Sequence, residues 1–177
     1  MATIEQSIEV AVPVRTAYDQ WTQFEEFPQF MDGVEEVRQL DDTHLHWVAS
    51  VAGKRKEWDA EITEQRPDER VAWRATDGTP NGGVVSFHRL TDSATRIMVQ
   101  MEHEAEGVLE KAGEALGFAE RRVKNDLEKF REYVESRGGA TGAWRGEVGT
   151  EPERFSGTDT GMPGHGRGLD EPNRDLN

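Results

Sequence analysis

Residues 109–136 read LEKAGEALGFAERRVKNDLEKFREYVES, and this stretch decides the fold. Apolar residues recur in it every three or four positions, which places them on one face of a single helix of about seven turns. A helix with one apolar face has to bury that face against another element. The apolar face consists of Leu109, Ala112, Leu116, Ala119, Val123, Leu127, Phe130 and Val134.

The chain ahead of this helix predicts a sheet. Apolar and polar residues alternate in short segments that turn residues separate, and the DGTPNG run at 77–82 is the strongest turn signal. Every connection is short, so neighbouring strands should be antiparallel. The predicted strands cover residues 3–10, 34–40, 44–51, 56–65, 70–76, 84–90 and 95–104.

Two short helices are expected between the first and second strands. Val14, Ala17, Tyr18 and Trp21 recur at helical spacing, and a second helix should lie around residues 24–31. We therefore predict an α+β fold in which a seven-stranded curved antiparallel sheet wraps around the long C-terminal helix. A curved sheet and the helix on its concave side enclose a pocket.

Alternation along the strands predicts what faces this pocket. Trp47, Trp58 and Trp73 share the apolar faces of their strands, so the inner wall should be wide and aromatic. Strand 84–90 is ambiguous, because Phe87 and His88 lie on opposite faces and both faces carry apolar residues.

Bulk composition excludes several function classes. The formal net charge of −14 argues against binding nucleic acid or anionic lipid surfaces. The absence of cysteine excludes disulfides and thiol chemistry. No apolar run approaches the ~18 residues that span a bilayer, and residues 1–12 lack the features of a signal peptide. These observations predict a cytoplasmic protein without stable membrane insertion.

Composition changes at Gly138. From Gly138 onward the chain holds ten of its eighteen glycines, and apolar residues become too sparse to form a second core. We expect a ligand-binding domain at residues 1–136 and a mostly disordered Gly/Pro-rich tail at 137–177. Trp144 is the one plausible anchor, and the tail should be dispensable for folding.

The order of elements resembles the helix-grip fold shared by START domains and the major birch pollen allergen family. Within that superfamily, the sequence is most similar to the polyketide cyclase/dehydrase and lipid-transport family. The order and spacing of the matching pieces, spread over residues 2–136, carry this resemblance. They include FEEFPQFM at 24–31, His46-Trp47, Glu57-Trp58, PDER at 67–70, Trp73, NGG at 81–83 and Asp126-Leu127.

The resemblance implies a deep hydrophobic cavity. Known members bind lipids, quinones, plant hormones or polyketide intermediates, and a minority catalyse ring closure and dehydration. Aromatase/cyclase members are thought to use a pocket tyrosine and arginine, but the tyrosine position falls near Val34 here, and the predicted pocket strands place their arginines outward. Binding or carriage of a hydrophobic or aromatic small molecule is therefore favoured. The alternatives are a polyketide cyclase/dehydratase acting on an aromatic intermediate, and a quinone- or ribosome-associated interaction module.

Candidate site residues follow from the inward faces and the helix. Gly113 and Gly117 thin the helix, which leaves room either for a ligand or for close packing on the sheet. His103 and Gln6 are the inward polar groups, and hence the weak catalytic candidates if the protein is an enzyme, a point that the sequence leaves open. The predicted ligand-binding set is Trp47, Trp58, Trp73, Val99, Met101, His103, Gly113, Leu116 and Gly117.

No metal or cofactor is predicted. His44 and His46 share one strand face but lack an obvious third ligand, so a solvated outer face is the better interpretation. The GGATG run at 138–142 follows no strand and precedes no lysine, which argues against a phosphate loop. The expected partner is a hydrophobic small molecule, and the oligomeric state stays open.

Overall fold

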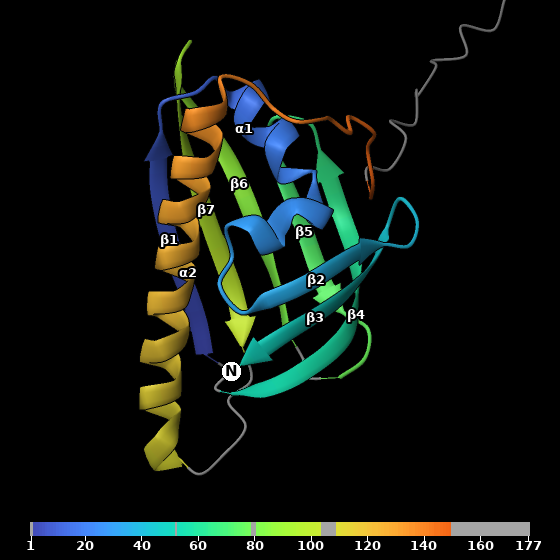
Figure 1. The fold of residues 1–177 in the computed structure, drawn as a ribbon, viewed down its shortest axis with the longest axis vertical. Helices are drawn as coiled ribbons and strands as arrows, with labels where there is room; N and C mark the ends of the chain where they lie inside the picture. Colours follow the sequence, from blue (N-terminus) through green and yellow to red (C-terminus); the bar gives the residue numbers. More distant parts are fainter. Residues whose placement is uncertain (1, 52, 79–80, 104–108, 150–177) are drawn as a thin grey trace, which may run out of the picture.

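The computed structural model describes residues 2–51, 53–78, 81–103 and 109–149, with the backbone alone described at residues 2, 51, 103 and 109–116 (Figure 1). One curved sheet wraps around one long helix. In chain order the elements are β1 (Ala2–Val10), α1 (Val14–Trp21), the 3₁₀-helix η1 (Phe24–Gln29), β2 (Val34–Gln39), β3 (His44–Val51), β4 (Lys54–Arg66), β5 (Arg70–Ala75), β6 (Asn81–Thr91), β7 (Ala94–His103) and α2 (Leu109–Arg137).

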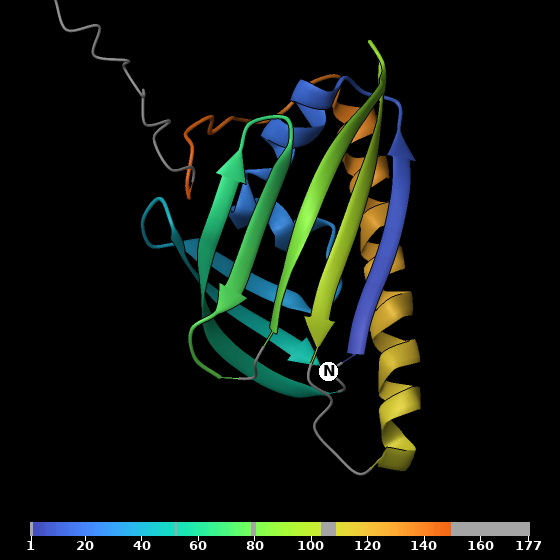
Figure 2. The ribbon, with the colours of Figure 1, turned by 180° about the vertical axis from the view of Figure 1, so that it is seen from behind.

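The seven strands form a single sheet in the order β1-β7-β6-β5-β4-β3-β2, with every pair antiparallel. Figure 2 shows the sheet from its convex side, with α2 behind it along β1. The predicted helix-grip architecture is confirmed. β6 begins at Asn81 rather than at residue 84, because Gly82 and Gly83 already pair with β7.

Helix α2 lies against the concave face of the sheet. Leu127, Phe130 and Val134 are buried, as their place in the apolar stripe predicts. The helix ends at Arg137, and Gly138 follows with φ +70°, a left-handed conformation that glycine adopts without strain. Among the described residues, no helix is long and apolar enough to cross a membrane.

The two short helices close one end of the sheet. α1 starts directly after Pro13, whose carbonyl accepts a hydrogen bond from the Ala17 N–H at 3.0 Å. The Trp21 ring then meets three other rings edge-on, with centroid distances between 5.0 and 6.2 Å. Edge-to-face contacts of this kind add to the stability gained from burial alone. The three partners are Phe27, Phe87 and Phe130.

The ambiguity in the 84–90 strand is resolved by β6. Val85 and Phe87 are buried on the concave side, whereas His88 is exposed. Val85 pairs with Val71 on one side and with Val99 on the other, which forms a row of valines on the floor of the sheet.

A mostly disordered tail was expected at residues 137–177, with Trp144 as the one plausible anchor, and the structure describes residues 138–149 of it. They lie against the domain, where Val148 pairs with Gln65 and Arg145 bridges two carboxylates. Backbone hydrogen bonds and ion pairs hold this segment against the domain. The expectation was based on the small number of apolar residues, which does not predict such polar contacts. Residues 150–177 lie outside the described residues.

Candidate functional site

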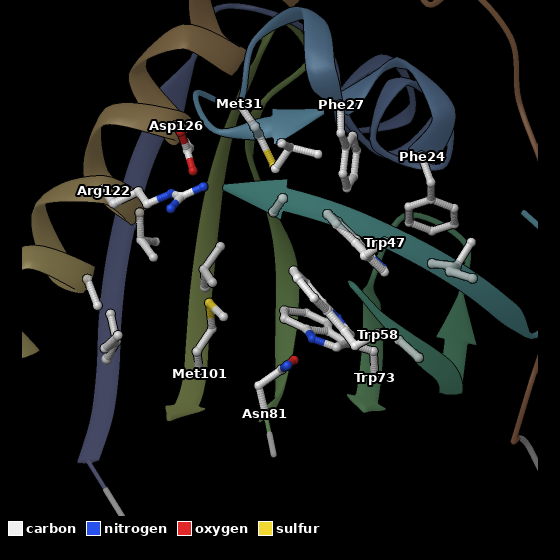
Figure 3. A pocket seen from close by; sticks show the side chains of 18 of the residues that line it. Phe24, Phe27, Met31, Trp47, Trp58, Trp73, Asn81, Met101, Arg122 and Asp126 are labelled. Atoms are coloured by element: carbon white, nitrogen blue, oxygen red, sulfur yellow. The ribbon is translucent and has the colours of Figure 1, made fainter. Parts of the chain in front are cut away.

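A cavity of about 490 Å³ lies between the concave face of the sheet and α2 (Figure 3). Its wall is mostly apolar, which suits a hydrophobic ligand. α2 contributes Phe118, Ala119, Arg122, Val123, Asp126 and Leu127, and the α1–η1 region contributes Trp21, Phe24, Phe27 and Met31. The strands contribute Ile4, Val34, Leu45, Trp47, Ala49, Lys56, Glu57, Trp58, Ala60, Ile62, Val71, Trp73, Asn81, Val99 and Met101.

Two stacked indoles form part of the wall. Trp47 and Trp58 are direct partners across the β3–β4 ladder, so their side chains leave the sheet on the same face. Their rings are nearly parallel, with an interplanar angle of 6° and centroids 5.8 Å apart. Phe27 from η1 lies 5.7 Å from the Trp47 ring. The result is an aromatic surface assembled from two strands and one helix, in which the Phe27 ring is tilted by 52° to the Trp47 ring.

Trp73 extends this aromatic wall, because its β6 partner is Gly83. A Cβ at Gly83 would lie 3.0 Å from the Trp73 ring and 2.5 Å from the Gln100 carbonyl oxygen. Real Cβ atoms do not approach backbone so closely. Glycine at this position therefore lets the indole lie across β6.

Arg122 and Asp126 bring charge into the apolar cavity. They stand one turn apart on α2, and Figure 3 shows their side chains next to each other at the α2 end of the cavity. The Arg122 Nη2 donates to the Asp32 carbonyl at 2.8 Å, and the Nη1 donates to the Ser50 carbonyl at 3.4 Å. These contacts fix the guanidinium between α2 and the β2–β3 edge of the sheet.

The Asp126 carboxyl is strongly perturbed. Burial raises its pKa from 3.8 to about 7, and the nearby Arg122 guanidinium opposes the shift without cancelling it. Its Oδ1 has no hydrogen-bond partner among the described residues. Near neutral pH this carboxyl can therefore both accept and release a proton inside the cavity.

The far end of the cavity is also polar. Asn81 lies beside Trp73, away from Arg122 and Asp126 (Figure 3). Phe118 lines the cavity and is nevertheless 47% exposed, so the cavity opens to solvent along this part of α2.

Among the predicted ligand-binding residues, the structure brings five together on the cavity wall. These are Trp47, Trp58, Trp73, Val99 and Met101.

The remaining predicted residues divide into two groups. Gln6 is half-buried on β1 and Gly117 lies on α2, and neither belongs to the wall. The side chains of His103 and Leu116 lie outside the described residues, as does the surrounding of Gly113. The roles of these five positions in ligand binding or catalysis stay predictions.

Arg122, Asp126 and Phe118 were not predicted as site residues. They follow one another at intervals of four, directly beside Ala119, Val123 and Leu127 of the apolar stripe. A second column at the same spacing indicates a helix face wider than the stripe. That spacing is the signal in the sequence that could have identified these residues.

The structure places a carboxylate beside each of the paired histidines, His44 and His46. His44 Nδ1 lies 2.9 Å from Asp41 Oδ1, and His46 Nδ1 lies 2.6 Å from Asp59 Oδ1. Each ring thus has its own carboxylate partner. Within the described part of the chain, no three His, Asp or Glu side chains are close enough to hold a metal ion.

Residues 10–131 match the sequence pattern of the family described as polyketide cyclase/dehydrase and lipid transport. The chain belongs to this family. A relative from Streptomyces lincolnensis, an uncharacterized 17.2 kDa protein of the melC2–rnhH intergenic region, shares 58% identity over 149 residues. The aligned part covers 84% of this chain and 99% of that protein.

Solved structures of similar fold include members with different descriptions. The ZhuI aromatase/cyclase from Streptomyces sp. R1128 aligns with a TM-score of 0.67 at 18% identity, covering 81% of this chain and 99% of that one. A START superfamily protein from Mycobacterium smegmatis aligns with a TM-score of 0.65 at 14% identity, covering 76% and 97%. At these identities the likeness shows the shared helix-grip fold and leaves the activity open.

Proposed function

We propose that this protein binds a hydrophobic, at least partly aromatic small molecule in the cavity between the sheet and α2. The observation that carries the proposal is the stacked Trp47–Trp58 pair, continued by Trp73, in a cavity large enough for a ligand of several rings. Indole faces favour flat apolar partners through offset stacking and burial of area.

The polar end of the cavity narrows the ligand class. Arg122 and Asp126 provide a hydrogen-bond donor and an acceptor side by side, and their charges offset each other when the Asp126 carboxyl is ionised. A neutral hydroxyl or carbonyl group can hydrogen-bond to this pair. A charged ligand group would be repelled by the member of the pair that has the same charge. We therefore expect an uncharged polar group on the ligand at this end.

Probe binding with a filled cavity tests the proposal. Ala119 lines the cavity on α2, and Lys124 is exposed on the same helix, so Ala119→Trp and Lys124→Trp form a matched pair. The probe is N-phenyl-1-naphthylamine, a neutral aromatic fluorophore. We expect Ala119→Trp to weaken probe binding by about tenfold or more. The substitution replaces the Ala119 methyl group with a much larger indole side chain, which fills part of the cavity. Lys124→Trp should bind like the wild type.

Two results would count against binding in this cavity. One is wild-type protein that leaves the probe fluorescence unchanged, and the other is equal binding by both variants. Native mass spectrometry of protein purified from its own host then identifies the natural ligand directly.

Acid–base catalysis on the bound ligand is the second candidate function. It is favoured by the Asp126 carboxyl, whose raised pKa near 7 suits a group that takes up and releases a proton at physiological pH. Incubation with the ligand recovered from the protein separates the two functions. A carrier returns the molecule unchanged, whereas an enzyme converts it and Asp126→Asn abolishes the conversion.

A further inference from the structure

Residues 138–149, which we name the clasp, cross the end of the domain where α1, η1 and the β4–β5 turn meet (Figure 1, orange). The clasp does not line the cavity. It contacts α1 and η1, which contribute residues to the cavity wall, and it also contacts β4 and the β4–β5 turn. These contacts fall into three sets.

Arg145 makes the first set of contacts. Its Nη1 lies 2.6 Å from Asp19 Oδ1 on α1, and its Nη2 lies 2.8 Å from Asp68 Oδ2 in the β4–β5 turn. The guanidinium also lies over the Tyr18 ring, 5.7 Å from its centroid. Asp19 is only 7% exposed, so removal of Arg145 leaves a buried carboxylate without this partner.

The second set covers an edge of β4. The β3–β4 ladder ends at the pair His44–Glu61, and β4 continues to Arg66 beyond it. Val148 pairs with Gln65 on this overhang through two backbone hydrogen bonds of 2.9 and 3.0 Å. The clasp thereby satisfies backbone groups that β3 is too short to reach.

The third set reaches the short helices. The Thr141 N–H donates to Gln20 Oε1 at 2.9 Å, and its hydroxyl donates to Glu26 Oε2 at 2.5 Å. The Trp144 N–H donates to Thr22 Oγ1 at 3.2 Å. Gln20 and Thr22 are both buried and flank Trp21, a residue of the cavity wall.

We propose that the clasp holds α1 and η1 in the position that the cavity wall requires, with Arg145 as its positioning residue for ligand binding. Trp21, Phe24 and Phe27 of this wall belong to the segment that the clasp ties to the β4–β5 turn. When the clasp is released, α1 and η1 sample other positions, and the fraction of protein with a binding-competent wall falls. Apparent affinity falls with that fraction. The proposal rests on the proposed function.

The test uses the full chain with Arg145→Met and Arg145→Lys. Hydrogen exchange measures residues 14–29 against residues 81–103, and N-phenyl-1-naphthylamine binding is titrated well below the unfolding transition. Ile97→Val and Ile97→Ala are the controls, because Ile97 is fully buried in the core but absent from the cavity wall. They lower stability at a buried position that belongs neither to the clasp nor to the cavity wall.

We expect Arg145→Met to speed exchange in residues 14–29 and to weaken probe binding about tenfold, while residues 81–103 exchange as in the wild type. Arg145→Lys keeps the charge, but a lysine ammonium cannot bridge both carboxylates as the guanidinium does. Its exchange rate and probe affinity should therefore lie between those of Arg145→Met and the wild type. The Ile97 variants should leave binding unchanged. If Arg145→Met does not fold, Asp68→Asn removes one carboxylate partner and suits the positive φ of that turn residue.

Unchanged exchange of residues 14–29 in Arg145→Met would overturn the proposal, and so would a binding loss no larger than that of an Ile97 variant of equal melting temperature. Wild-type protein that fails to bind the probe contradicts the proposed function instead. The exchange of residues 14–29 then decides alone whether the clasp positions this wall.

Discussion

At the scale of single residues, Asp126 links the cavity to pH. Its pKa is about 7 in the folded chain because burial disfavours the charged form, and it returns to the ordinary value of 3.8 in the unfolded chain. Between these values the native state binds more protons than the unfolded state, so this carboxyl lowers stability as pH rises from about 4 to 7. Asp126→Asn cannot titrate. It should gain stability over the wild type across this range, by about 1–2 kcal/mol at pH 8 after allowance for partial exposure.

Thermal unfolding of both proteins from pH 4 to pH 8 checks this prediction. Glu128→Gln removes one carboxyl from the exposed side of the same helix and serves as the control, which should not reproduce the trend. Parallel melting-temperature profiles for Asp126→Asn and the wild type would show that the Asp126 carboxyl is not perturbed by the cavity.

At the scale of elements, the consecutive glycines Gly82 and Gly83 of β6 differ in how much space a side chain would have. A Cβ at Gly83 would meet the Gln100 carbonyl and the Trp73 ring, whereas a Cβ at Gly82 approaches only the Trp73 carbonyl at 3.1 Å and the Arg74 side of the strand. Gly83→Ala should therefore cost about 2 kcal/mol through overpacking and should also move the Trp73 indole. Gly82→Ala should cost less. Urea unfolding and tryptophan emission spectra of the two variants measure both effects, and equal losses would contradict this account of the sheet.

At the scale of the whole molecule, the clasp bears on stability as well as on the cavity. A chain that ends at Gly139 loses the Arg145 ion pairs and the Val148 pairing, whereas a chain that ends at Gly149 keeps every clasp contact described here. We expect the shorter chain to melt about 6 °C below the longer one, which corresponds to about 2 kcal/mol for a domain of this size. Differential scanning calorimetry of the two chains makes the comparison. Equal melting temperatures would support the sequence-based expectation that everything after α2 is dispensable.

The sequence by itself determined the architecture and the aromatic wall. Periodicity of 3.6 and of 2 is set by local backbone geometry, so the apolar stripe of α2 and the inward faces of Trp47, Trp58 and Trp73 can be read without coordinates. Short connections between consecutive strands predict an antiparallel sheet. A helix with one apolar face buries that face against the sheet.

Only the tertiary structure decided the polar chemistry and the clasp. Arg122 and Asp126 read as solvated charges until the curvature of the sheet brings the Asp32 and Ser50 carbonyls to the helix and buries the carboxyl. Arg145 reads as part of a flexible tail until α1 and the β4–β5 turn place Asp19 and Asp68 on either side of it. Both features depend on contacts between residues far apart in the chain, whose energies come from burial and charge at distances that local periodicity does not encode.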